Sequence, residues 1–316
     1  MSLYLLKSGI YGVCVGDAFG LPMQFKTRKY MEENPISNMT DLKSLSIPKG
    51  TWSDDSSLTL CLAESLSRGF DLSDISQNFI KWYEEGFLTP DNKAFDVGNT
   101  TEKAMTKLKN GILPENSGGQ KVEDNGNGSL MRILPLSFYL SLKETNEDVY
   151  YDQIRLISSI THAHGISIIA CSIYIDFAIQ LIHGNSIKEA YVGICRKQKK
   201  YFEISDTIGV ENYSRILNGN LSEEKRADIN SSRYVVESLE AALWCLLTSN
   251  NYEETILKAV HLGDDTDTVA AIAGGLAGLY YGFDTIPKQW LEDLRKKDII
   301  DKVCEKFSNY LYDEHD

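Results

Sequence analysis

Apolar residues recur along this chain with the spacing of three to four positions that is typical of α-helices, and strand-like alternation is nearly absent. The spacing predicts helices over residues 3–18, 54–68, 73–86, 99–110, 130–143, 150–160, 165–183, 186–197, 233–248, 252–261, 268–282 and 287–309. No repeat of fixed period and no Pro/Ser-rich linker divides these segments. We therefore expect one all-α domain over residues 1–316, built as a single multi-helix bundle.

Small residues repeat every fourth position near both ends of the chain, at Gly12, Gly16 and Gly20 and again at Ala270, Gly274, Gly278 and Gly282. Residues four apart share one helix face, so each of these helices has a face with almost no side chain. Glycine inside a helix costs about 1 kcal/mol relative to alanine. Close packing of the two backbones in the centre of the domain is the compensation we expect, and both helices should then bring their polar ends to one pocket.

The composition narrows the class of protein. A chain of 316 residues with 42% apolar residues can bury a large core, and its net charge of −13 argues against nucleic acid as a partner. The six cysteines are scattered without a C-x-x-C pair, as expected for reduced thiols of a cytoplasmic protein. The N-terminal residues lack the basic and long apolar regions of a signal peptide, so we do not expect one. The most apolar stretch, 166–182, carries Asp176 and Gln180 and is shorter than a bilayer span, so we expect a core helix and no membrane association.

Two acidic segments each lead into a predicted apolar helix, Ser53-Asp54-Asp55 near the N-terminus and Asp264-Asp265-Thr266-Asp267-Thr268 near the C-terminus. Helix capping is the alternative for either segment alone, because Ser and Asp are favoured caps and acidic groups stabilise a helix start. A cap needs one acceptor oxygen, however, and each helix offers at least three. If the fold joins the segments, about five carboxylates converge, and a pair of hard cations such as Mg²⁺ or Mn²⁺ would neutralise them.

Three other polar segments lead into predicted helices. The run Asn125-Gly126-Asn127-Gly128-Ser129 could hold a diphosphate on backbone N–H groups, although Asn-Gly also forms plain turns. His162 could hydrogen-bond a ligand hydroxyl or phosphate, with a core or capping position as the alternative. Asp96 could act as an acid or base, or could serve only as a cap or turn residue.

In this order along the chain, the segments closely resemble the ADP-ribosylglycohydrolase family. The resemblance lies in Gly16-Asp17-Ala18-Phe19-Gly20-Leu21-Pro22, Trp52-Ser53-Asp54-Asp55-Ser56, Asp96-Val97-Gly98-Asn99-Thr100-Thr101, Gly126-Asn127-Gly128-Ser129-Leu130-Met131-Arg132, Thr161-His162 and Gly263-Asp264-Asp265-Thr266-Asp267-Thr268. The stretch 95–101 is most similar to the branch that contains the dinitrogenase reductase-activating glycohydrolase. The resemblance implies an orthogonal all-α bundle with a central cleft for two Mg²⁺ or Mn²⁺ ions.

Carried over position by position, the resemblance also implies roles for single residues. The implied metal ligands are Ser53, Asp54, Asp55, Asp265, Asp267 and Thr268. The implied ADP-ribose contacts are Gly98, Asn127, Gly128, Ser129 and His162, and the candidate catalytic residues are Asp96, Asp55 and Gln24. Gln24 departs from the family, which commonly has Glu there, and an amide can neither accept a proton nor neutralise a cation as a carboxylate does.

The resemblance thus implies a metal-dependent hydrolase that removes ADP-ribose from protein side chains, arginine first, or from a small ADP-ribose conjugate. Its transition state would be oxocarbenium-like, as in glycoside hydrolysis. Because of Gln24, a weak or inactive relative that binds ADP-ribose or serves structurally remains an alternative. So do a two-metal phosphohydrolase that releases AMP and an immunity protein that reverses or blocks a toxin's ADP-ribosylation.

Overall fold

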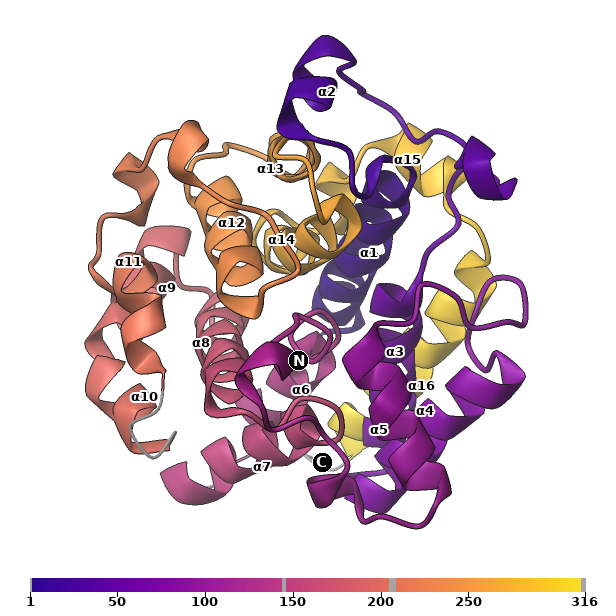
Figure 1. Ribbon diagram of the computed structural model, residues 1–316, viewed down its shortest axis with the longest axis vertical. Coiled ribbons are helices and arrows are strands. Elements are labelled where there is room, and N and C mark those ends of the chain that lie inside the picture. The colour runs from indigo at the N-terminus through magenta and orange to yellow at the C-terminus, as the bar shows by residue number, and fades with distance from the viewer. Residues whose placement is uncertain (1, 144–145, 205–208, 314–316) are drawn as a thin grey trace.

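The computed structural model describes residues 2–143, 146–204 and 209–313. Its α-helices (Figure 1) are α1 (Leu3–Gly20), α2 (Arg28–Glu33), α3 (Asp54–Leu66), α4 (Leu72–Glu85), α5 (Asn99–Lys109), α6 (Leu134–Ser141), α7 (Glu147–Ser159), α8 (Gly165–Ile182), α9 (Ile187–Arg196), α10 (Gln198–Ile204), α11 (Ser214–Leu217), α12 (Val235–Leu247), α13 (Tyr252–His261), α14 (Thr266–Tyr281), α15 (Lys288–Asp293) and α16 (Lys297–Asp313). Short 3-10 helices lie at η1 (Leu21–Met23), η2 (Lys43–Leu45), η3 (Pro114–Asn116), η4 (Val122–Asp124), η5 (Val210–Tyr213), η6 (Leu221–Glu223), η7 (Arg226–Asp228) and η8 (Phe283–Thr285). The described residues form no strand, and the all-α prediction is confirmed.

Helices α1 and α14 pack directly against each other near the centre of the molecule (Figure 1). A Cβ atom added to Gly12 would lie 2.2 Å from the carbonyl oxygen of Gly274, and one added to Gly16 would lie 2.1 Å from that of Ala270. No side chain larger than hydrogen fits at such distances. The predicted contact between the two small-residue faces is therefore confirmed, and the ends of α1 and α14 are fixed relative to each other.

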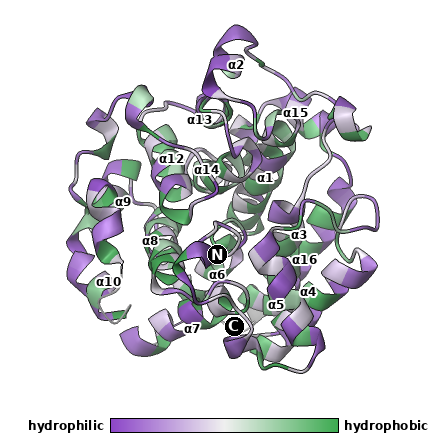
Figure 2. Ribbon diagram, in the orientation of Figure 1, coloured by the Kyte–Doolittle hydropathy of each residue, from purple (hydrophilic) through white to green (hydrophobic). Residues whose placement is uncertain are grey.

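The other helices surround this pair. Helices α12 and α13 pack on α14, α3 and α16 pack on α1, and α8 lies against α6, α7, α9 and α12. Figure 2 shows that α1 and α14 are largely apolar, whereas peripheral elements such as α2 are mainly polar. A peripheral helix such as α9 buries one face, formed by Ala190, Tyr191 and Ile194, as expected for an amphipathic helix that covers a core.

Helix α8 is the one helix among the described residues that is long and apolar enough to cross a membrane, by length and composition alone. The expectation that this stretch is too short therefore fails on length. However, 78% of it is buried inside the protein, because it packs against helices on several sides. Its burial supports the predicted core helix.

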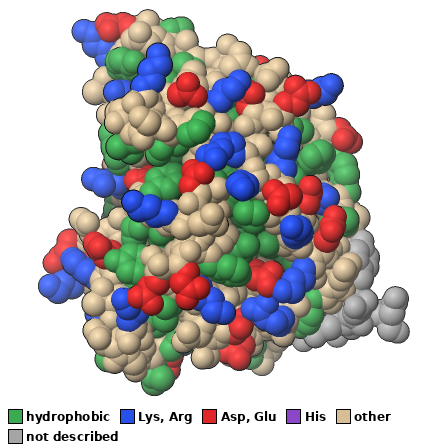
Figure 3. All heavy atoms as spheres, turned by 90° about the vertical axis from the view of Figure 1, so that its right-hand side faces the viewer, with side chains coloured by type: hydrophobic (Ala, Val, Ile, Leu, Met, Phe, Trp, Pro, Cys, Tyr) green, Lys and Arg blue, Asp and Glu red, His purple; other side chains and the backbone are tan. Residues whose placement is uncertain are grey.

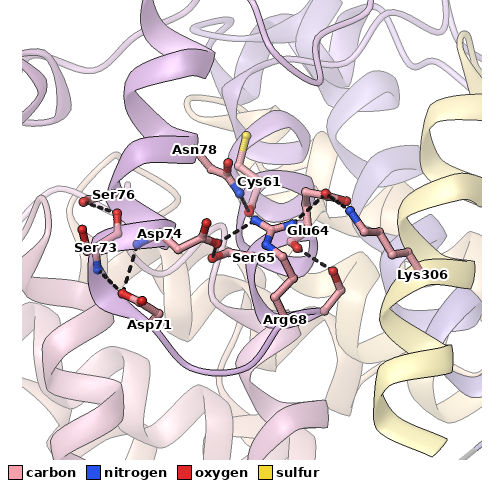
Figure 4. Close-up of polar contacts among 11 residues, drawn as sticks. Cys61, Glu64, Ser65, Arg68, Asp71, Ser73, Asp74, Ser76, Asn78 and Lys306 are labelled. Atoms are coloured by element: carbon pink, nitrogen blue, oxygen red, sulfur yellow. Dashed lines mark hydrogen bonds and ion pairs between the residues drawn. The ribbon is translucent and has the colours of Figure 1, made fainter. Parts of the chain in front are cut away.

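A polar network ties the C-terminal end of α3 to α4 and α16 (Figure 4). The Arg68 guanidinium donates to Glu64 at 2.9 Å and to Asp74 at 2.6 Å. Ser65 also donates to Asp74, and Lys306 of α16 donates to Glu64. Exposed ion pairs contribute about 0–1 kcal/mol each, so the network chiefly orients these helix ends. It lies at the opposite end of α3 from the acidic residues at the start of that helix.

Several helix boundaries differ from the prediction for local reasons. The helix predicted over 130–143 begins only at Leu134, with Pro135 in its first turn, where a missing N–H costs nothing. The helix predicted over 150–160 begins earlier, at Glu147, because the Asn146 side chain accepts a hydrogen bond from Val149 N at 2.8 Å. Helices α2 and α10 are not predicted by the apolar pattern.

Tertiary contacts interrupt the long helix predicted over 287–309. It is divided into α15 and α16 by an extended Leu294 and by Lys296, which has φ 54°. Between them, Arg295 N donates to Gly50 O and Arg295 O accepts from Trp52 Nε1, both at 3.0 Å. The polar stretch predicted over 205–231 contains short helical turns from residue 210 onward, while residues 205–208 lie outside the described part of the chain.

Figure 3 shows the side of the molecule on which α4 and α16 lie. Lysine and arginine side chains there alternate with aspartate and glutamate, and hydrophobic side chains are scattered among them. This face of the described residues therefore offers no continuous basic surface of the kind that binds phosphates of nucleic acids.

Candidate functional site

A cavity of about 340 Å³ lies where the starts of α3, α5 and α14 meet the loop before α6. Its wall includes Asp54 from α3, Asp265 and Thr268 from the start of α14, and Asp96 before α5. A larger hollow of about 580 Å³ between α2 and α13 contains none of the predicted site residues. We therefore identify the smaller cavity as the candidate active site.

Asp17, in the last turns of α1, joins α1 to the start of α3. Its buried carboxylate accepts hydrogen bonds from Ser53 N at 2.9 Å, from Ser56 N at 3.1 Å and from Ser56 Oγ at 2.5 Å. Burial raises the pKa of Asp17 to about 6, although these hydrogen bonds lower it. Because α1 is held against α14, Asp17 places the first acidic segment next to the second. The sequence shows Asp17 within a family motif but does not indicate this positioning role.

The two acidic helix starts meet at Asp55. Its Oδ2 atom accepts hydrogen bonds from Thr268 Oγ1, 213 residues away in the sequence, at 3.4 Å and from Ser53 Oγ at 3.1 Å. Gly20 permits this approach, since a Cβ atom there would lie 2.4 Å from Thr266 O. The structure thus brings the two segments together, as the glycine pattern predicts.

Several of these carboxylate oxygens are buried without a partner. Asp55 Oδ1 and both carboxylate oxygens of Asp267 lack a hydrogen bond to any described residue. Burial, followed by the charges of neighbouring aspartates, raises the pKa of Asp54, Asp55 and Asp267 well above the ordinary value. Burial raises the pKa of Asp265 to about 6, opposed by a hydrogen bond that Asn127 Nδ2 donates at 2.6 Å. Such a cluster needs protons or cations to be stable.

The expected binuclear metal centre is not formed by the side chains as they stand. Within residues 2–143, 146–204 and 209–313, no three His, Cys, Asp or Glu side chains make a group that could hold a metal ion. The donor chemistry nevertheless fits a hard cation. The unpartnered atoms of Asp55 and Asp267 are carboxylate oxygens, and the hydroxyls of Ser53 and Thr268 contact the same cluster. Mg²⁺ and Mn²⁺ prefer such ligands.

Asp96 and Gln24 form a pair on the same cavity wall. Gln24 Nε2 donates to Asp96 Oδ2 at 2.8 Å, and both residues line the cavity. Asp96 has φ 60°, a left-handed conformation that is uncommon for a residue other than glycine. A glutamate at position 24 would face the Asp96 carboxylate and repel it, whereas the amide makes a hydrogen-bonded pair.

The predicted ADP-ribose contacts are placed unequally. Gly98 lines the cavity at the N-cap of α5, and Gly128 lines it against His162, whose Cε1 would lie 2.8 Å from an added Cβ. Asn127 lines it too, but its amide already donates to Asp265 and to Ser238 Oγ.

The Ser129 side chain does not belong to the cavity wall. Its hydroxyl is buried, lies in hydrogen-bond contact with Ser158 Oγ at 3.0 Å and accepts a hydrogen bond from Cys171 Sγ at 3.5 Å. Residues 126–128 of this loop line the cavity, but the sequence cannot tell which of the neighbouring side chains faces inward, because the loop has no regular periodicity.

His162 contributes to the cavity wall and is buried. Burial and the nearby Arg132 cation lower the pKa of His162 to about 3. The imidazole is therefore neutral in the physiological range and is not a proton-transfer group there.

Arg233 is a cavity residue that the sequence does not single out. Among the described residues that line the cavity it is the one Lys or Arg, and it shares the wall with the acidic residues Asp54, Asp96, Glu123 and Asp265. Its guanidinium lies 5.1 Å from the centre of the Phe25 ring, over the ring face. An anionic ligand in this acidic cavity would need such a cation, and no local motif around Arg233 predicts it.

Comparisons with known proteins agree with this geometry. The model of the ADP-ribosylglycohydrolase family matches residues 6–316. The chain is 32% identical over 321 residues to the ADP-ribosylarginine hydrolase Tri1 of Serratia proteamaculans (strain 568), an alignment that covers 100% of this chain and 81% of the relative. It is 28% identical to the ADP-ribosyl-[dinitrogen reductase] glycohydrolase of Rhodospirillum rubrum, over 90% of this chain and 88% of the relative.

A solved structure described as an ADP-ribosylglycohydrolase-related protein complex has a TM-score of 0.79 with 26% sequence identity, and 98% of each chain is covered. The family model, the relatives and the fold therefore agree over nearly the whole length. The resemblance inferred from the motifs is confirmed, and the relatives include both a dinitrogen reductase glycohydrolase and an arginine hydrolase. The chain belongs to the ADP-ribosylglycohydrolase family and is a hydrolase.

Proposed function

We propose that the protein hydrolyses the N-glycosidic bond between ADP-ribose and an arginine side chain, with divalent cations held by the two acidic helix starts. The arginine linkage is supported by similarity to the ADP-ribosylarginine hydrolases Tri1 of Serratia proteamaculans and Pseudomonas putida. The substrate would be an ADP-ribosylated protein or a small ADP-ribosyl-arginine conjugate. A cytoplasmic location fits the six free cysteines, because thiols stay reduced there.

One observation carries the proposal: unpartnered carboxylate oxygens of Asp55 and Asp267 are buried beside a polar cavity. Burying a carboxylate without a partner is costly, and one or two hard cations would remove that cost. The groups that would hold Mg²⁺ or Mn²⁺ are Ser53, Asp54, Asp55, Asp265, Asp267 and Thr268. Of these, Asp54, Asp265 and Thr268 line the cavity itself, where a ligand could reach them.

The reaction breaks the bond between the anomeric carbon and the guanidino nitrogen, adds the hydroxyl of water to the ribose and returns a proton to the leaving nitrogen. When bound, divalent cations supply positive charge that neutralises the carboxylates and polarises water and ribose hydroxyls. Asp96, held by Gln24 at 2.8 Å, is the carboxyl group available to position or deliver the proton. Arg233 and the N-terminus of α5 provide positive charge for the diphosphate.

A second candidate, a protein that binds ADP-ribose with little or no turnover, is favoured by the same Gln24 contact. The amide occupies one oxygen of Asp96, and this hydrogen bond could hold the carboxylate away from the reaction. Gln24→Glu should then raise turnover, and unchanged turnover in that variant would show that the Gln24 amide does not limit the reaction.

The direct test is to incubate the protein with arginine-, serine- and O-acetyl-linked ADP-ribose, with Mg²⁺, with Mn²⁺ and with a chelator. We expect free ADP-ribose and unmodified arginine from the arginine-linked substrate, only when a divalent cation is present, as identified by mass spectrometry. Release of AMP would indicate a phosphohydrolase instead. Tight binding without products would support the second candidate.

Two variants in one segment make the test specific. Asp267→Asn should abolish turnover, because it removes a buried acidic group from the proposed cation site. Asp264→Asn is the matched control, since Asp264 is exposed and is not part of the cavity wall. Its φ of 60° also suits asparagine, so this variant should keep full activity.

A further inference from the structure

Arg132 is a buried cation beneath the cavity. Its side chain is fully buried and makes no ion pair with an acidic group of the described residues. The guanidinium instead donates to Gly128 O and to Thr161 Oγ1, the latter at 2.8 Å, and it stacks 4.8 Å from the centre of the Phe79 ring. Burial lowers the pKa of Arg132 to about 10, so it remains charged near neutral pH and always acts as a hydrogen-bond donor.

The Thr161 hydroxyl must therefore donate a hydrogen bond to another acceptor. Its hydroxyl is fully buried and accepts from Arg132, so its own hydrogen needs an acceptor. The acceptor available among the described residues is His162 Nδ1, at 2.7 Å. If Nδ1 carried a proton, the hydroxyl hydrogen would be buried without a partner. The stable arrangement has a bare Nδ1 and the ring proton on Nε2.

The main chain of His162 is held in place as well. His162 N donates to Ser158 O, and Ser158 Oγ donates to His162 O, both at 2.8 Å. Nε2 lies next to the cavity residues Gly126 and Gly128, since Cβ atoms added there would lie 3.5 Å and 3.4 Å from it. Side chains at these positions would cover the nitrogen, so the two glycines leave it open to a ligand.

We propose that Arg132 and Thr161 are positioning residues that hold His162 as a neutral donor, with its Nε2–H directed to an acceptor oxygen of the bound ADP-ribose. The identity of the ligand rests on the proposed function, whereas the tautomer does not. In this assignment His162 contributes to binding and exchanges no proton with the substrate.

The tautomer can be read directly by long-range ¹H–¹⁵N NMR correlation on the full-length protein with ¹⁵N-labelled histidine. Only five histidines are present, and His162→Gln identifies the signal. We expect one Nε2–H tautomer without titration between pH 5 and 8. A proton on Nδ1, or protonation of the ring between pH 5 and 8, would overturn the proposal. This test needs no variant of Thr161 or Arg132. This result stands whether or not arginine-linked ADP-ribose is cleaved.

Thr161→Val keeps the shape and removes the hydroxyl. We expect the tautomers to mix and the Kd for ADP-ribose to rise about tenfold, the effect of losing one well-placed hydrogen bond, while kcat changes much less. Thr161→Ser should restore both properties. Thr255→Val removes another buried hydroxyl, in α13, and should leave the His162 signal and the Kd unchanged. An unchanged tautomer and Kd in Thr161→Val would overturn the positioning role.

Discussion

The substitution Gly16→Ala tests the contact on which the whole site depends. Gly16 lies in α1 where its backbone touches α14, and an added Cβ would lie 2.1 Å from the Ala270 carbonyl oxygen and 2.6 Å from its carbonyl carbon. Ordinary contacts between such atoms are about 3.5 Å. The two helices would therefore have to separate by more than about 1 Å, because neither backbone can rotate away as a side chain can.

The size of the effect follows from two opposing terms. Inserting an extra carbon into a packed core costs typically about 1–3 kcal/mol, and here the upper end applies because main chain meets main chain. Alanine returns about 1 kcal/mol relative to glycine inside a helix. We expect the free energy of unfolding to fall by about 2 kcal/mol and activity to fall with it, because the separation moves Asp17 away from the start of α14.

Urea denaturation at fixed cation concentration measures this change, with Gly193→Ala as the matched control. Gly193 lies inside α9, where an added Cβ would meet only Gln180 side-chain atoms at 3.7 Å. That variant should gain up to about 1 kcal/mol of stability from helix propensity alone and keep its activity. If Gly16→Ala were as stable as Gly193→Ala, the close packing of α1 on α14 would be refuted.

Three further predictions concern the charged groups of the candidate site. In the presence of a chelator, Asp267→Asn should raise the free energy of unfolding, because it removes an unpartnered buried charge. The same variant should lower the affinity for Mn²⁺ at least tenfold, as measured by calorimetry. A lower free energy of unfolding in the chelator would contradict the argument. The folded pKa of Asp17 and Asp265, raised to about 6, lies above the unfolded value, so the metal-free protein should lose stability as pH rises from about 4 to beyond 6. Added Mg²⁺ should therefore stabilise more at pH 7.5 than at pH 5, and equal shifts in melting temperature would oppose this. Arg233→Gln should raise KM about tenfold, the loss expected for one hydrogen bond to a charged group, with Arg233→Lys partly active; an unchanged KM would place Arg233 outside the binding site.

The sequence predicts the central helix pair because glycines inside a helix are locally destabilising and must be compensated by a contact with a distant part of the chain. Glycine every fourth residue destabilises an isolated helix, and only a backbone partner across the face compensates. The same reasoning brings the polar ends of both helices together, and the structure joins them through Asp17 and Thr268. Periodicity therefore predicts this part of the fold and the acidic floor of the cavity.

The features that the sequence does not predict depend on tertiary contacts, which the periodicity of apolar residues cannot reveal. Leu294 to Lys296 interrupt a helical pattern because this segment pairs with the chain around Gly50. Arg233 precedes α12 without a motif, and its role appears only when the cavity wall assembles. In each case a partner distant in sequence decides the conformation, so no window of neighbouring residues can predict it.

The strained residues of the site show how closely this chemistry depends on the core. Phe25, Asp96 and Asp264 have φ of 62°, 60° and 60°, which costs about 1 kcal/mol or more for each non-glycine residue. Phe25 N donates to Asp264 O at 2.6 Å, and Asp264 N donates to Lys26 O at 2.7 Å, so each strained segment holds the other. Phe25 follows α1 and the short η1, and Asp264 lies just before α14. The glycine contact that aligns the two helices therefore also stabilises the strained loop after α1, which places Gln24 within hydrogen-bond distance of Asp96.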